Sequence, residues 1–149
     1  MMNRSQPDDS QLRKVAETCV CASLRRLSRT VTQLFDKELR PTGLRATQVT
    51  LLVALGLAKE ISVTRLGEIL AMDRTTLSRN LVPLAREALL QQEGAADDAR
   101  RKVIRLTPKG RLALRDALPR WRRAQRRVLA KLGPSRWPHL GRELGALMS

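Results

Sequence analysis

Apolar residues recur every three to five positions over the first forty residues of the chain, after a polar start. The stripe runs from Leu12 to Leu39, and Pro41 and Gly43 follow it. This spacing is that of an amphipathic helix, and proline and glycine are typical residues just beyond a helix end. The pattern therefore predicts a long helix over residues 10–40.

Two shorter helices are predicted next. The stretch ATQVTLLVALGLA, from Ala46 to Ala58, is an apolar helical run. In the following stretch, ISVTRLGEILA, Ser62 can accept amide hydrogens as the cap of a short helix. Met72 and Asp73 then make a tight break before another helix begins.

The helix that starts at Asp73 has faces of different character. Asp73 can accept the free amide hydrogens of the first turn. We expect Pro83 to kink this helix rather than end it, because its apolar stripe continues past the proline. The stripe, which must be buried, consists of Leu77, Leu81, Leu84 and Ala88. Short polar residues and arginines fill the other positions of the first two turns: Arg74, Thr75, Thr76, Ser78, Arg79 and Asn80.

Two short extended runs, LLQQE and RKVIRLT, flank the turn GAADDAR and predict a β-hairpin. Thr107 can cap the long helix that follows, with Pro108 at its first position. A second proline, Pro119, is expected to bend that helix. Gly133 separates it from a last short helix that ends near Met148.

The order of these elements predicts a mainly α fold with a small β-wing. A short helix, a tight break and a polar-faced helix form a helix-turn-helix, and the basic hairpin makes it a winged one. We expect one domain over residues 1–149, with the winged helix-turn-helix in residues 44–107. Because this lobe closes its own core, the amphipathic helices in residues 10–40 and 108–148 need another surface. They predict a homodimer.

The net charge narrows the function. The 149 residues carry 29 Lys and Arg against 14 Asp and Glu, a formal charge of +15. Such an excess indicates a polyanionic partner, with nucleic acid as the first candidate and an anionic membrane surface as the second. The longest apolar stretch, from Val49 to Ala58, is too short to span a bilayer, and the start has no apolar core of a signal peptide. We therefore expect a cytoplasmic protein without a membrane partner.

The polar-faced helix suits the major groove of DNA. Arg74 and Arg79 can reach guanine edges or phosphates, and the short side chains between them allow a close approach. The alternative is an ordinary solvated helix. At the hairpin tip, Arg100, Arg101 and Lys102 can contact DNA, and an arginine there can enter a narrow minor groove. Asp98 repels phosphate, but it can hold Arg100 in one rotamer by a salt bridge. The alternative is a solvated turn of mixed charge.

Two stretches together resemble the MarR family of transcriptional regulators. They are LGEILAMDRTTLSRNLVPLAREALL and DDARRKVIRLTPKG, and the resemblance extends over nearly the whole chain. The wing signature of that family corresponds here to Asp98, Arg100, Val103, Ile104, Leu106, Thr107 and Gly110. The resemblance implies an obligate homodimer and a repressor that a small ligand releases from its operator, often an aromatic or phenolic acid. It places the ligand pocket between the dimer region and the DNA-binding lobe.

The two cysteines, Cys19 and Cys21, offer an alternative function. Cys21 falls about where a hydroperoxide-sensing branch of the family carries its reactive cysteine. That branch tunes its thiolate with tyrosines, and this chain has none. An inert, buried thiol is therefore expected, although Arg25 and Arg26 could favour the thiolate. Residues two apart on one helix point about 200° apart, so no metal site is expected.

No enzyme signature is present: the chain lacks a nucleophile elbow, a phosphate loop and a zincin helix. We expect no cofactor. The rival class is a basic RNA-associated protein. Specificity separates the two, because a regulator binds one inverted-repeat duplex much more tightly than random duplex.

Overall fold

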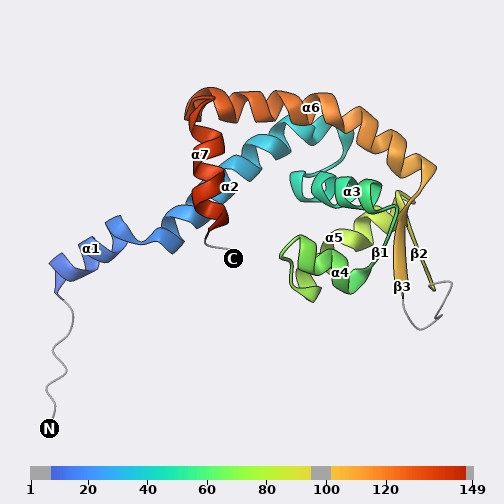
Figure 1. Cartoon of the computed structure of the whole chain (residues 1–149), viewed down its shortest axis with the longest axis horizontal. Coiled ribbons are helices and arrows are strands. Elements are labelled where there is room, and N and C mark those ends of the chain that lie inside the picture. Colours follow the sequence, from blue (N-terminus) through green and yellow to red (C-terminus); the bar gives the residue numbers. More distant parts are fainter. Residues whose placement is uncertain (1–7, 95–101, 147–149) are drawn as a thin grey trace, which may run out of the picture.

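The computed structural model describes residues 8–94 and 102–146 of the chain. Helices form most of the molecule, and a small sheet lies at one end of it (Figure 1). The helical elements are α1 (Asp9–Thr18), α2 (Val20–Leu39), the 3-10 turn η1 (Arg40–Thr42), α3 (Ala46–Ala58), α4 (Val63–Ile69), α5 (Arg74–Arg86), α6 (Pro108–Leu132) and α7 (Arg136–Gly145). The strands are β1 (Glu60–Ser62), β2 (Leu90–Gly94) and β3 (Lys102–Leu106). The predicted mainly α fold with a small β-wing is confirmed.

The core of the lobe is made of leucines from α3, α4 and α5. Their burial supplies the main stabilisation, because apolar surface leaves water. The fully or almost fully buried leucines are Leu51, Leu52, Leu55, Leu66, Leu77 and Leu84. The predicted stripe of α5 is confirmed except at its end. Ala88 is exposed with a φ of 55°, because α5 ends at Arg86 and Leu89 enters the core instead.

The described sheet has the order β1–β3–β2, and both pairs are antiparallel. The predicted hairpin is confirmed, with Leu90 opposite Leu106. The sequence did not predict β1. Its three residues are too few for a recognisable alternation, and Ile61 pairs with Ile104, far along the chain.

The predicted long N-terminal helix is interrupted, so the expectation of one continuous helix was wrong. Cys19 has an extended backbone, and its sulfur accepts the amide hydrogen of Ala22 at 3.4 Å as the cap of α2. Thr18 and Val20 are β-branched and favour helix less than their neighbours in α2. Helix α1 projects from the body (Figure 1), and none of its residues is buried.

Helix α2 packs along α6 and connects it to the lobe. The rings of Phe35 and Trp121 lie 6.0 Å apart between these helices. Glu38 of α2 forms an ion pair with Arg127 of α6. The carboxylate of Asp36 accepts the Ala46 amide at 2.7 Å, which satisfies a free amide at the start of α3.

The start of α6 is fixed against the end of α5. The Thr107 hydroxyl donates to the Ala88 carbonyl at 2.7 Å and accepts the Gly110 amide at 3.0 Å, so the predicted cap is confirmed. Lys109 donates to the Glu87 carbonyl at 2.8 Å. As expected, helix continues past Pro83 in α5, and α6 likewise continues beyond its internal proline.

Candidate nucleic-acid interface

Asp73 caps helix α5, as predicted. Its carboxylate accepts the Thr76 amide at 2.8 Å and the Thr76 hydroxyl at 2.6 Å. These bonds, the hydroxyl first, lower the pKa of Asp73 below its ordinary value of 3.8. The contribution of this cap to stability is therefore fully present above about pH 4 and is lost as the pH falls through the lowered pKa. At neutral pH the cap is intact, and the Thr76 hydroxyl donates its hydrogen to Asp73.

Four of the six predicted α5 residues are exposed without a side-chain partner among the described residues. They are Arg74, Thr75, Ser78 and Arg79. The Asn80 amide donates to the Thr76 carbonyl at 2.8 Å, so both Thr76 and Asn80 are bonded within the helix. The two arginines and two hydroxyls form a face that can donate and accept hydrogen bonds. No acidic side chain among the described residues pairs with either arginine of that face.

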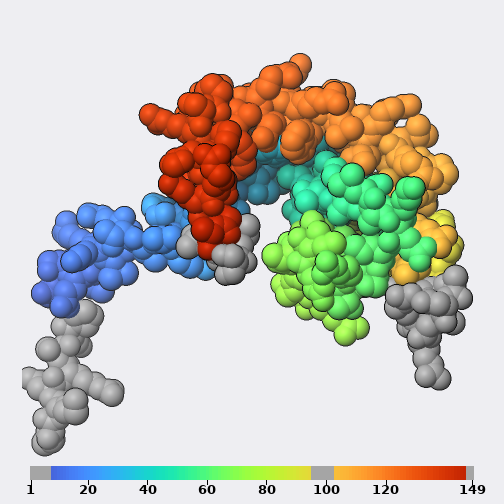
Figure 2. All heavy atoms as spheres, viewed as in Figure 1, coloured from blue at the N-terminus to red at the C-terminus, as the bar shows by residue number. Residues whose placement is uncertain are grey.

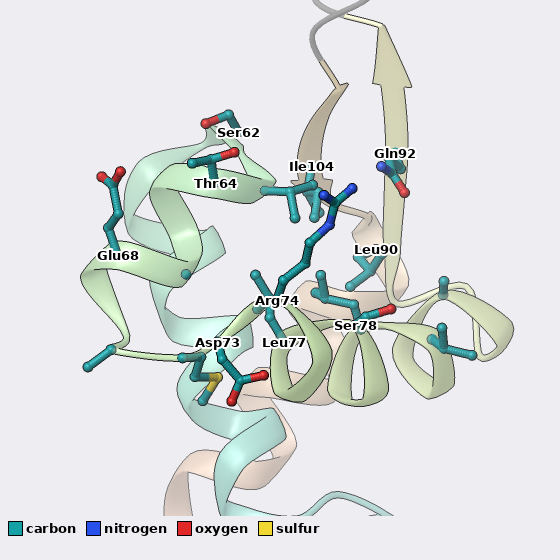
Figure 3. A pocket seen from close by; sticks show the side chains of 17 residues that line it. Ser62, Thr64, Glu68, Asp73, Arg74, Leu77, Ser78, Leu90, Gln92 and Ile104 are labelled. Atoms are coloured by element: carbon teal, nitrogen blue, oxygen red, sulfur yellow. The ribbon is translucent and has the colours of Figure 1, made fainter.

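A groove of about 1070 Å³ lies between α4, α5 and the sheet. In Figure 3 the Arg74 side chain extends from α5 across this groove toward Ile104 of β3. Buried Leu77 lies below it, while Thr64 and Gln92 bring polar groups from α4 and β2. The sequence did not predict Thr64 or Gln92 as site residues. No local signal marks them, because their position depends on how α4 and β2 pack around α5.

The stem of the wing is held by charge pairs across the sheet. Arg105 of β3 donates to Glu60 of β1 at 2.8 Å and lies 3.9 Å from the carboxylate of Glu93 in β2. Strands β2 and β3 lie beside α5 on one side of the molecule (Figure 1). The predicted tip residues Asp98, Arg100 and Arg101 lie outside the described residues, as does the side chain of Lys102.

The cysteines differ from expectation. Cys21 is exposed rather than buried, and the Arg25 guanidinium approaches its sulfur at 3.8 Å. Cys19 is half-buried at the interruption between α1 and α2. The two thiols therefore do not belong to one continuous helix. Within residues 8–94 and 102–146, no cluster of three or more His, Cys, Asp or Glu is placed to hold a metal ion.

Comparison with known proteins identifies the family. Residues 44–110 match the winged helix DNA-binding domain family. The M. tuberculosis transcriptional regulator MosR, solved in complex with DNA, is 40% identical over 87% of this chain and 92% of its own, with a TM-score of 0.77. A probable transcriptional regulator from Pseudomonas aeruginosa is 30% identical over 89% of this chain and 98% of its own, with a TM-score of 0.81. A mutant E. coli MarR complexed with operator DNA shares the fold. It covers 91% of this chain and 97% of its own with a TM-score of 0.82, at 17% identity.

The chain belongs to the MarR family of transcriptional regulators. It is a DNA-binding regulator of MarR type and not an enzyme. In helix-turn-helix proteins the second helix of the motif lies in the major groove, and α5 holds that position in this chain. No protein among curated sequences matches the chain. Across the described residues, no helix has the length and apolar character needed to cross a membrane.

Proposed function

We propose that the protein is a homodimeric repressor that binds a pseudo-palindromic DNA operator and is released by a small aromatic or phenolic ligand. The observation that carries this proposal is the exposed, unpartnered face of α5, with Arg74, Ser78 and Arg79 beside the wing. The DNA complexes of MosR and of E. coli MarR support the operator, because those proteins share this fold. Such a regulator acts where the DNA is, which we expect to be the cytoplasm.

Each part of the interface has a distinct role in this proposal. Arg79 reads a guanine edge in the major groove, and the short Thr75 and Ser78 side chains let the helix approach the bases. Thr76 and Asn80 fix the first turns of α5, Thr76 through the cap and Asn80 through its bond to a backbone carbonyl. The wing residues Asp98, Arg100, Arg101 and Lys102 contact the flanking minor groove, where Asp98 orients Arg100.

The helices at both ends of the chain support the homodimer. Neither α1 nor α7 buries a residue against its own chain. Large apolar side chains remain exposed on the terminal helices. Monomeric proteins rarely expose large contiguous apolar patches. The exposed side chains are Leu12, Val15, Val20, Leu24, Leu27 and Trp137. A second copy related by a two-fold axis would cover these side chains and place two α5 helices on two half-sites.

The dimer is expected to persist in dilute solution. Light scattering at micromolar concentration should give twice the 16.8 kDa mass of one chain. A charged substitution on the exposed apolar stripe, Leu27→Glu, should shift the mass toward one chain, because it places a charge in the interface. The matched control is Gln33→Glu, also at an exposed position of α2 but about 120° around the helix from Leu27. A single-chain mass for the unsubstituted protein contradicts the proposal.

Operator specificity tests the function directly. The expected result is that the protein binds an inverted repeat upstream of its own gene at least about 10³-fold more tightly than random duplex at the same salt concentration. Fluorescence anisotropy measures both affinities. Equal affinity for all duplexes, together with preference for structured RNA, would instead support the RNA-associated alternative.

The groove beside α5 supports the ligand part of the proposal. Arg74 can pair with the carboxylate of an aromatic acid, and Leu77 and Ile104 offer apolar contact to its ring. This groove lies within the DNA-binding lobe, whereas the family resemblance places the pocket next to the dimer region. A thermal-shift screen of small aromatic acids, coupled to release of the operator, tests the ligand. A compound that raises the melting temperature and releases DNA supports it.

A second candidate function, a thiol-based response, is favoured by the exposure of Cys21 and its contact with Arg25. The ligand-released repressor needs no thiol, so Cys21→Ser should leave operator affinity unchanged and the response to peroxide small in both proteins. Anisotropy with submillimolar organic peroxide measures this, and Cys19→Ser is the matched control. Release from the unsubstituted protein but not from Cys21→Ser would establish peroxide sensing by that thiol.

A further inference from the structure

Helix α6 has a basic face that points away from the rest of the chain. Its inner stripe, which includes buried Ala117 and Ala124 and half-buried Trp121, packs on α2 and α3. Since successive helical residues are about 100° apart, the positions opposite this stripe are fixed by the sequence. Those positions hold four exposed arginines, which we name the outer basic face: Arg115, Arg122, Arg123 and Arg126.

Three of the four charges of this face are not neutralised by any described residue. Arg122, Arg123 and Arg126 form no ion pair or side-chain hydrogen bond with any described residue. Arg115 lies 3.1 Å from Asp116, its neighbour in sequence, and both side chains are largely exposed. By contrast, Arg127 on the flank of α6 is paired with Glu38. Like charges at this spacing repel, so an external anion would stabilise the outer basic face.

The outer basic face lies away from the elements that meet the operator. In Figure 1, α6 runs along one side of the molecule, α4 and α5 lie on the other, and α3 lies between them. Figure 2 shows the same separation between the atoms of α6 and those of α4 and α5. A straight duplex held by α5 is therefore not within reach of these arginines.

We propose that the outer basic face binds the phosphate backbone of a second DNA duplex, without sequence preference, while α5 holds the operator. Arg115 and Arg126 are eleven residues apart, or about 16 Å along the helix axis. Duplex DNA carries one negative charge about every 1.7 Å of its axis, so a row of this length can reach several phosphates. Arginine suits the purpose, because its planar guanidinium donates two parallel hydrogen bonds to phosphate oxygens.

The composition of the face favours duplex DNA over other anionic partners. Among the outward positions of α6, all within the described residues, no aromatic side chain is present, and Trp121 packs inward on Phe35. Single-stranded nucleic acids are held largely by stacking on aromatic rings, and protein interfaces are enriched in aromatic residues. A membrane surface requires a substantial apolar face beside the charges. A row of arginines alone matches a phosphate backbone.

A capture experiment with the full-length protein tests the second site. The operator duplex is fixed to beads, saturated with protein and washed, and a labelled duplex without an operator sequence is added at low salt. The unsubstituted complex is expected to capture the labelled duplex. Capture by Arg122→Ala/Arg126→Ala should fall at least about tenfold, and the slope of log affinity against log salt for this second duplex should decrease by about two. Its operator affinity should change less than twofold.

Two control proteins distinguish the effect of where the charges lie from the effect of losing charge. Arg13→Ala/Lys14→Ala removes the same charge from α1 and should capture the second duplex normally. Arg122→Lys/Arg126→Lys keeps the charge and should retain most of the capture, because phosphate contact depends mainly on charge. The proposal is overturned if the unsubstituted complex binds its operator but captures no second duplex, or if both alanine pairs lose capture equally. If Arg122→Ala/Arg126→Ala also loses operator affinity to the same degree, the face contacts the operator and not a second duplex. If polyglutamate displaces the labelled duplex as readily as unlabelled duplex does, the partner of the face is an acidic protein.

Discussion

Gly110→Ala is expected to destabilise the protein by about 4 kcal/mol, the range of the strongest single-residue effects. Gly110 is buried in the first turn of α6. A Cβ atom there would lie 1.9 Å from the carbonyl oxygen of Leu89 and 2.8 Å from a methyl group of Leu106. The carbonyl cannot move away easily, because it accepts the Thr107 amide at 3.1 Å. Helix α6 would therefore have to separate from the end of α5.

Urea unfolding at equal protein concentration measures this effect, since the stability of a dimer depends on concentration. The matched control is Gly56→Ala in α3, where an added Cβ would make only ordinary contacts, 3.8 Å from methyl groups of Leu106 and Leu114. That substitution should stabilise the helix by about 0.5–1 kcal/mol, because alanine loses less conformational entropy than glycine. If the free energy of unfolding of Gly110→Ala lies within about 1 kcal/mol of that of the unsubstituted protein, the junction of α5 and α6 is not rigid.

The elements that the sequence predicted correctly are those with local signals. Asp73 and Thr107 are capping residues, and each is bonded to an amide three positions later. The leucine spacing of α5 reports burial because it repeats over about two turns of one helix. The same locality explains why the exposed face of α5 could be proposed as a binding surface: residues on one helix keep their relative positions wherever the helix lies.

The features that the sequence did not predict depend on distant parts of the chain. Strand β1 exists because Ile61 pairs with Ile104. Helix α5 ends where the Thr107 hydroxyl donates to the carbonyl of Ala88, which adopts a positive φ there. The groove beside α5 needs Gln92 from the wing. No hydrophobic periodicity or capping residue in the local sequence indicates any of these contacts, so the sequence pattern could not predict them.

The bonded junction between α5 and α6 also has a functional consequence. Thr107 and Lys109 connect the start of α6 to the two residues that follow α5, Glu87 and Ala88. A displacement of α6 is therefore transmitted directly to the helix proposed to read DNA. In the homodimer that we propose, α6 extends from the wing toward the dimer region, so the spacing of the two α5 helices would follow from how the copies pack. Release of the operator then requires only a change in that spacing, because two half-sites must be matched at once.

Arg79→Ala is expected to weaken operator binding by about 1–3 kcal/mol, or roughly 5- to 150-fold, and to relax base preference at one position in each half-site. The Arg79 side chain is exposed on α5 without a partner among the described residues, so its removal leaves the folded protein intact. A guanidinium donates two parallel hydrogen bonds to a guanine edge, and an ammonium group cannot match that geometry. For this reason Arg79→Lys should restore the charge but not the base preference.

The salt dependence of binding decides between a base contact and a phosphate contact of Arg79. A base contact leaves the slope of log affinity against log salt nearly unchanged in Arg79→Ala, whereas loss of a phosphate contact reduces the slope by about one. Anisotropy on the operator and on duplexes substituted at single positions measures the slope and the base preference together. Full rescue by Arg79→Lys, with a uniform loss across all sequences in Arg79→Ala, would show that Arg79 holds the backbone. Base recognition by α5 would then rest on Arg74, whose side chain extends from the first turn into the groove beside the wing.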